Sequence, residues 1–143
     1  MDEQEAPPLP GDWLPARDAG SGPWNIGVLW YNRAEGRMAL HVGEQHCNAY
    51  GSIHGGAMAT FVDGQAAAVL DYREDDPSGH TPTISLSVDY IGPAPSGSWL
   101  VADVTMLRAT RTMIFTQAVV TVDGQVVARS NAIYRNVPGK VPQ

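Results

Sequence analysis

Apolar and polar side chains alternate through the second half of the chain, which is the pattern of half-buried strands. The alternation predicts four strands, over residues 82–93, 98–109, 112–123 and 125–136. In the first of them, one face carries Ile84, Leu86, Val88 and Tyr90, and the other carries Ser85, Ser87 and Asp89. The Asp123-Gly124 pair between the last two segments is a strong signal for a two-residue hairpin. We therefore expect an antiparallel meander.

The first half of the chain predicts two shorter strands followed by one helix. The strands are expected over residues 24–32 and 36–43. From Gly55 to about Tyr72 there is no proline, and good helix formers with apolar side chains on nearly every side predict a buried helix. Gly64 within it indicates close packing against a neighbour. This order predicts an α+β domain, with a curved antiparallel sheet of about five or six strands around one long central helix.

Length and composition indicate one soluble domain. Of the 143 residues, we expect 1–23 to be a flexible arm, 24–136 the folded domain and 137–143 a tail. The acidic start is unlike a signal peptide, and no apolar run approaches the roughly 20 residues that cross a membrane. Cys47 is the only cysteine, which is typical of a protein in the reducing cytoplasm.

The charge pattern narrows the class of ligand. A formal net charge of −6 argues against non-specific nucleic-acid binding. The last third of the chain nevertheless gathers four arginines, which are Arg108, Arg111, Arg129 and Arg135. A local cationic patch for an anionic ligand is therefore compatible with the acidic chain. The histidines have no metal-ligand spacing, so we expect no metal site.

Asp63 is a carboxylate where the helix pattern predicts burial. A buried carboxylate without partners is costly and raises its own pKa, so Asp63 needs hydrogen-bond donors or a chemical task. His54-Gly55-Gly56 precedes it at the expected helix start. The glycines leave backbone N–H groups open to an anion or a developing oxyanion, with the helix dipole in support. The alternative is a tight turn that needs glycine only for its backbone conformation.

The spacing of these two features predicts a site shared between subunits. If the helix starts at Gly55, Asp63 lies roughly 12 Å further along it, at about 1.5 Å per residue. One chain cannot then bring both groups to one small reacting centre. An antiparallel pair of such helices in a two-fold dimer would bring each Gly55 towards the partner's carboxylate.

The motif as a whole resembles the hot-dog fold acyl-CoA thioesterases of the phenylacetate-pathway, or PaaI-like, branch. The residues that carry the resemblance are Asn48, Gly51, His54, Gly55, Gly56 and Asp63. It continues through "SVDYIGPAPSG" and the closing meander, and covers residues 25–136. The resemblance implies hydrolysis of a thioester between an acyl group and coenzyme A, with CoA entering as substrate and no cofactor. It also implies a homodimer that assembles into a homotetramer.

The resemblance assigns roles to single residues. Asp63 would attack the thioester or activate water, and the Gly55 N–H would polarise its carbonyl. Asn48 would position that carbonyl or the water, His54 would shape the turn, and Thr83 would hold the water. Asn48 has an alternative role in bonding its own loop, and Thr83 as an ordinary strand residue.

The remaining expectations concern the substrate. Gly56, Arg108 and Arg111 are candidates for binding it, the arginines through the anionic CoA nucleotide; their alternative is solvated turn charge. Six aromatic residues are candidates for an aryl-acyl pocket, with the core as the alternative: Trp24, Trp30, Tyr50, Phe61, Tyr72 and Tyr90. Two rival functions are a non-catalytic acyl-CoA binding or sensing module and an enoyl-CoA hydratase or dehydratase. The second typically uses an Asp/His pair in a helix-start pattern that this sequence lacks.

Overall fold

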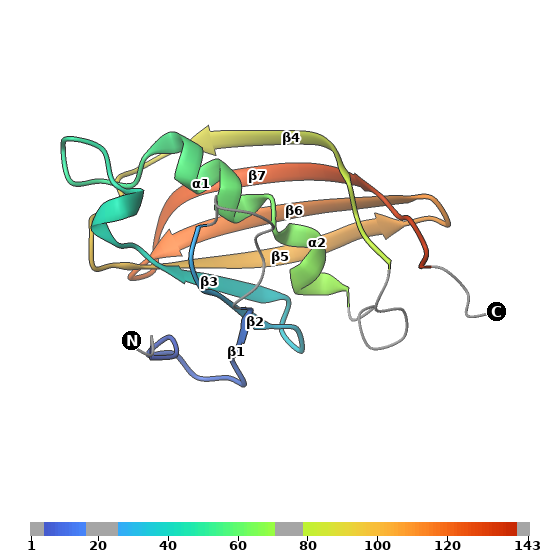
Figure 1. Ribbon diagram of the computed structural model, residues 1–143, viewed down its shortest axis with the longest axis horizontal. Helices are drawn as coiled ribbons and strands as arrows, with labels where there is room; N and C mark the ends of the chain where they lie inside the picture. The colour runs from blue at the N-terminus through green and yellow to red at the C-terminus, as the bar shows by residue number, and fades with distance from the viewer. Residues whose placement is uncertain (1–4, 17–25, 71–78, 140–143) are drawn as a thin grey trace.

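The period-two segments form one antiparallel sheet in the computed structural model, which describes residues 5–16, 26–70 and 79–139 (Figure 1). Its strands are β1 (Leu14–Ala16), β2 (Leu29–Asn32), β3 (Arg37–His41), β4 (Thr83–Tyr90), β5 (Trp99–Ala109), β6 (Met113–Val122) and β7 (Gln125–Arg135). Their order across the sheet is β1-β2-β3-β5-β6-β7-β4. All six predicted strands are present, and the α+β architecture is confirmed.

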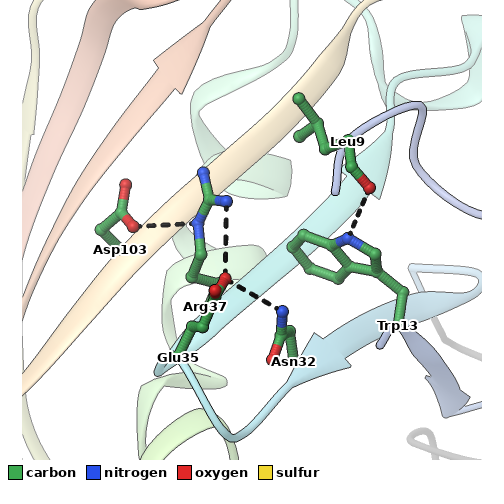
Figure 2. Close-up of polar contacts among 6 residues, drawn as sticks. All are labelled: Leu9, Trp13, Asn32, Glu35, Arg37 and Asp103. Atoms are coloured by element: carbon green, nitrogen blue, oxygen red, sulfur yellow. Dashed lines mark hydrogen bonds and ion pairs between the residues drawn. The ribbon is translucent and has the colours of Figure 1, made fainter. Parts of the chain in front are cut away.

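The sheet has seven strands, so the prediction of about five or six was too low. The additional strand, β1, lies within the segment expected to be a flexible arm, and it pairs with β2. Trp13, just before it, is buried against Trp30 and Val101. Its indole N–H donates to the Leu9 carbonyl at 3.2 Å (Figure 2). Burial of this indole fixes a segment whose proline-rich composition predicts mobility.

The N-terminal segment covers the side of the sheet opposite the helices. Ala39 packs with Trp13, whereas its neighbours Met38 and Leu40 belong to the main core. Successive residues of a strand point to opposite faces. The outer cluster on this side consists of Trp13, Trp30, Ala39 and Val101. Arg37 lies beside it, with its guanidinium 5.8 Å from the Trp13 ring centre and its Nε 3.0 Å from the Asp103 carboxylate (Figure 2).

The expected central helix is present, but it is interrupted and consists of α1 (Gly55–Val62) and α2 (Gln65–Val69). At the break, hydrogen bonds span three residues: the Gly64 N–H donates to Phe61 and the Ala67 N–H donates to Gly64. Close packing at Gly64 is confirmed, because a Cβ there would lie 3.0 Å from the Tyr31 hydroxyl. The helical pattern ends at Leu70, which is extended, and Tyr72 lies outside the described residues.

Both helices lie on one face of the sheet (Figure 1). The main core lies between the helices and the sheet. Several of its large side chains are at most 1% exposed, and these include Met38, Leu40, Met58, Phe61 and Leu100. At the end of the sheet away from β1, β4 pairs with β7 alone among the described residues, so its other edge is open there. No residue of β4 is buried. An open edge of this length is a ready template for pairing with another strand.

Candidate active site

The first residue of α1 has an amide with no acceptor among the described residues. His54 precedes the helix, and its Nδ1 accepts from the Gly56 N–H at 3.0 Å. The His54 carbonyl accepts from the N–H groups of Ala57 and Met58, at 3.0 and 3.1 Å. Within the described part of the chain, the Gly55 N–H has no such partner. His54 thus occupies the turn-shaping position, and Gly55 presents the free donor at the positive end of the helix dipole.

A tyrosine of the open-edge strand fixes Gly55 in place. The Tyr90 hydroxyl donates to the Gly55 carbonyl at 2.7 Å. The tyrosine ring lies 3.4 Å from the place where a Cβ on Gly55 would be. The start of α1 is therefore attached to the end of β4.

Asp63 is at the other end of α1, and its side chain is exposed in the single chain, which corrects the expectation of burial. It leaves the helix at the break and faces β4 instead of the core. The Thr83 hydroxyl donates to its carboxylate at 2.7 Å. The structure thus joins these two residues, which are 20 positions apart.

The setting of the carboxylate perturbs its acidity. Desolvation by the surrounding protein raises the pKa of Asp63 above 3.8, and the hydroxyl groups of Thr83 and Tyr134 oppose this rise. Exposure and desolvation coexist because one side of the carboxylate lies against β4 and the other faces solvent. A carboxylate with a raised pKa is a better proton acceptor than a free one.

Sequence reasoning missed the buried groups beneath this carboxylate. The Tyr134 hydroxyl, on β7, donates to the main-chain carbonyl of Asp63 at 2.7 Å. Gln65 is fully buried and bonds to Ser130 and Thr116, both at 2.9 Å. Burial, together with the nearby Asp63 charge, raises the pKa of Tyr134 well above 10. The available signal was the presence of Thr116 and Ser130 on the otherwise apolar faces of their strands.

Asn48 bonds its own loop, as its alternative role predicted. Its side-chain oxygen accepts from the N–H groups of Tyr50 and Ser52, at 2.9 and 3.3 Å. Its main-chain N–H donates to the Ser52 carbonyl at 2.8 Å, and Gly51 completes the turn with a φ of 76°. Only the amide NH₂ of Asn48 is then left for a substrate or water.

A hollow of about 420 Å³ opens beside the start of α1. Its walls are Ile26, Gln45, His46, His54, Gly56, Ala57 and Thr60. None of the aromatic candidates in the described part of the chain lines it: Phe61 is in the core, Trp30 is in the outer cluster, and Tyr50 and Tyr90 are exposed. Trp24 and Tyr72 lie outside the described residues. The aromatic candidates among the described residues therefore do not line this hollow.

The two candidate arginines lie at the Asp63 end of the sheet. Arg108 is near the end of β5 and Arg111 is in the turn to β6; both are exposed. Across the sheet, Ala109 of β5 pairs with Ile114 of β6, Ile114 with Tyr134 of β7, and Tyr134 with Thr83 of β4. This row of residues therefore connects the Arg108 end of β5 to the strand end that binds Asp63. Neither arginine has a carboxylate within 4.0 Å among the described residues.

The described residues contain neither a metal-ligand cluster nor a membrane-spanning helix. No group of three or more His, Cys, Asp or Glu side chains there is arranged to hold a metal ion. No helix in residues 5–16, 26–70 or 79–139 is long and apolar enough to cross a membrane.

Comparison with known proteins identifies the family. The model of the thioesterase superfamily matches residues 50–128, which is more than half of the chain. Human acyl-coenzyme A thioesterase 13 is 30% identical over 92 residues, which are 63% of this chain and 64% of that protein.

Solved structures show the same fold. A mutant of the phenylacetic acid degradation protein PaaI from Thermus thermophilus superimposes with a TM-score of 0.61 at 21% identity, over 71% of this chain and 84% of that one. A hypothetical thioesterase from Streptococcus pneumoniae, solved with coenzyme A, gives 0.61 at 18% identity, over 75% and 83% of the two chains. This chain therefore belongs to the thioesterase superfamily: it is a thioester hydrolase with the hot-dog fold of PaaI-like proteins.

Proposed function

We propose that this protein hydrolyses acyl-CoA thioesters to a free acid and CoA, in sites that two subunits share. The observation that carries the proposal is that α1 offers one free catalytic group at each end. These are the Gly55 N–H, which has no acceptor in the described residues, and the Asp63 carboxylate, which Thr83 orients. The human relative is an acyl-coenzyme A thioesterase, and the Streptococcus pneumoniae structure contains coenzyme A; both support acyl-CoA as the substrate class.

The chemistry needs only these groups. The Gly55 N–H and the helix dipole stabilise the negative charge that develops on the thioester oxygen. In one route Asp63 removes a proton from a water that adds to the carbonyl carbon; the carbon–sulfur bond then breaks, the free acid forms and the proton passes to the CoA thiolate. In the other route Asp63 attacks the carbonyl carbon and the carbon–sulfur bond breaks, which leaves an acyl–Asp63 anhydride; water then hydrolyses the anhydride to the free acid, and its proton passes to the CoA thiolate. Because thiolate is a good leaving group, we propose that no metal or cofactor takes part.

The open edge of β4 explains how the subunits combine. The Gly55 carbonyl is bonded to Tyr90, at one end of β4, and Asp63 is bonded to Thr83, at the other end. Antiparallel pairing of two β4 strands places the Thr83 end of each beside the Tyr90 end of its partner. Each Asp63 would then lie near a partner's Gly55, and the two-fold symmetry of the dimer would make the two sites equivalent. A homotetramer would be a pair of such dimers.

The other candidates complete the site. The NH₂ group of Asn48 would position the thioester carbonyl or water, and Gly56 would let substrate approach the helix start. Arg108 and Arg111 would bind CoA phosphates, since arginine forms strong charge-assisted bonds with phosphate. The free thiol of Cys47 fits a reducing cytoplasm, where we place the protein.

The test is thiol release from short, medium, long and aryl acyl-CoA esters, for wild type and Asp63→Asn. We expect the wild type to hydrolyse at least one ester and Asp63→Asn to lose nearly all of that activity. Asp89→Asn, on β4, is the control, because Asp89 is also exposed and its one side-chain partner among the described residues is Arg129. Full activity in Asp63→Asn would contradict the proposal. Tight binding of CoA esters by an inactive wild type would favour the binding module instead.

A further inference from the structure

Three hydrogen bonds converge on the break between α1 and α2, of which two are buried and one is partly buried. The Tyr134 hydroxyl donates to the Asp63 carbonyl at 2.7 Å. The Gln65 amide donates to Ser130, and its oxygen accepts from Thr116, both at 2.9 Å. These bonds hold the residues directly before and after Gly64 to two strands, β6 and β7.

Tyr134 supplies a bond that the helix gives up. In an unbroken helix, the Asp63 carbonyl would accept from the Ala67 N–H four residues on. Here that N–H donates to Gly64, and the Asp63 carbonyl is left to Tyr134. A buried carbonyl without a donor is unfavourable, so the tyrosine makes the break a stable conformation.

Gln65 is a polar residue at a fully buried position. It is 0% exposed and precedes three alanines in α2, and both ends of its amide have partners. A buried polar side chain without partners would destabilise the fold, whereas a fully bonded one fixes a single geometry. The start of α2 therefore has one position relative to the sheet.

We propose that Tyr134 and Gln65 are positioning residues for hydrolysis, which hold the α1–α2 break so that the Asp63 carboxylate leaves the helix beside Thr83. This inference rests on the proposed function, in which Asp63 is the catalytic carboxylate. The hydroxyl of Tyr134 bonds the backbone of the same residue whose carboxylate binds Thr83. Both ends of Asp63 are thus fixed, one from β7 and one from β4.

Among the described residues, the ionisable groups around the break come from β7 and from β2 and the turn after it. Tyr134 faces it from β7 and Tyr31 from β2, with the Tyr31 hydroxyl 3.0 Å from the Cβ position of Gly64. Arg33, after β2, donates to the Ala67 carbonyl of α2 at 2.9 Å. The first and last turns of α1 contain no acidic or basic residue. Tyr134 lowers the pKa of Asp63, so its removal raises that pKa.

The test compares Tyr134→Phe with Ile114→Val in the full-length chain. Ile114 packs in the same cluster as Tyr134, so its variant reproduces a loss of packing but keeps the hydroxyl. For Tyr134→Phe we expect kcat to fall roughly tenfold or more with KM nearly unchanged, since small displacements of a catalytic group have large effects. The acid limb of its kcat/KM profile should move to higher pH. Ile114→Val should keep the wild-type profile.

A second variant reaches the network through Gln65. Ser130→Ala removes the acceptor of the Gln65 amide and leaves Tyr134 intact, and we expect a smaller fall in kcat at constant KM. Wild-type kcat and acid limbs in folded Tyr134→Phe and Ser130→Ala, beside an inactive Asp63→Asn, would overturn this inference and leave the proposed function standing. Active Asp63→Asn would overturn both.

Discussion

Replacing Gly55 with proline removes one amide hydrogen from the start of α1 while the helix remains able to form. Proline is tolerated at the first helical position because the N–H there has no helical acceptor. The preceding residue also fits, since His54 has φ −67° and ψ 140°, the extended conformation that a following proline favours. The substitution therefore tests the hydrogen-bond donor itself.

The expected loss follows from the role of the donor. Removing one oxyanion donor typically lowers kcat by about 100- to 1000-fold, or about 3–4 kcal/mol of transition-state stabilisation. Gly55→Pro should show a loss of this size. Gly55→Ala is the matched control, because it keeps the N–H and its Cβ would lie 3.4 Å from the Tyr90 ring, an ordinary contact. Its kcat should remain within about threefold of wild type, as for most substitutions without a lost interaction.

The assay is steady-state thiol release from an acyl-CoA ester, with kcat and KM determined separately. Circular dichroism and thermal unfolding show whether each variant is folded. If folded Gly55→Pro and Gly55→Ala have equal kcat values, the Gly55 N–H is not an oxyanion donor and the reasoning is refuted.

Three further predictions concern Thr83, Asp63 and the N-terminal segment. Thr83→Val removes a hydroxyl that lowers the pKa of Asp63, so the acid limb of the kcat/KM profile should move to higher pH. Thr83→Ser keeps a hydroxyl and should remain close to wild type. An acid limb that does not move in Thr83→Val would exclude a role of Thr83 in setting the pKa of Asp63. Because the raised pKa makes ionisation of Asp63 less favourable in the folded chain, Asp63 lowers stability above that pKa, and the deficit vanishes as the pH falls through it. Asp63→Asn should therefore have a higher Tm than wild type at pH 7 and an equal Tm in acid, and a lower Tm at pH 7 would contradict this sign. Trp13→Ala should lower the free energy of unfolding in urea by about 3 kcal/mol, because the indole is buried, whereas Leu14→Ala, at a side chain 63% exposed, should have little effect; equal losses would show that Trp13 does not fix the segment.

Most of the fold was predictable because its strands alternate cleanly. The Asp123-Gly124 hairpin and the start of the helical segment at Gly55 lie where local signals placed them. β1 was not predictable, because three residues are too few for a periodic pattern. The position of β1 is fixed by Trp13, which contacts Trp30 and Val101, two residues that are distant in the sequence.

The candidate site was predictable only in part. The motif identified Gly55 and Asp63, and spacing along the helix separated them. The break at Gly64 was not predictable, because helix propensity describes local preference, whereas Gln65 bonds two distant strands and Tyr134 bonds Asp63 from one of them. The expectation that Asp63 is buried failed for the same reason, since a break turns the carboxylate towards β4.

The most direct test of the shared site is to mix two inactive variants. Gly55→Pro and Asp63→Asn each damage every site of their own homodimer. In a mixed dimer, one site combines both intact residues and the other combines both defects. After co-refolding at equal amounts, half of the dimers are mixed, so we predict recovery of about a quarter of wild-type activity. Activity no higher than the mean of the two separate variants, in demonstrably mixed dimers, would contradict a site formed by Gly55 and Asp63 of different subunits.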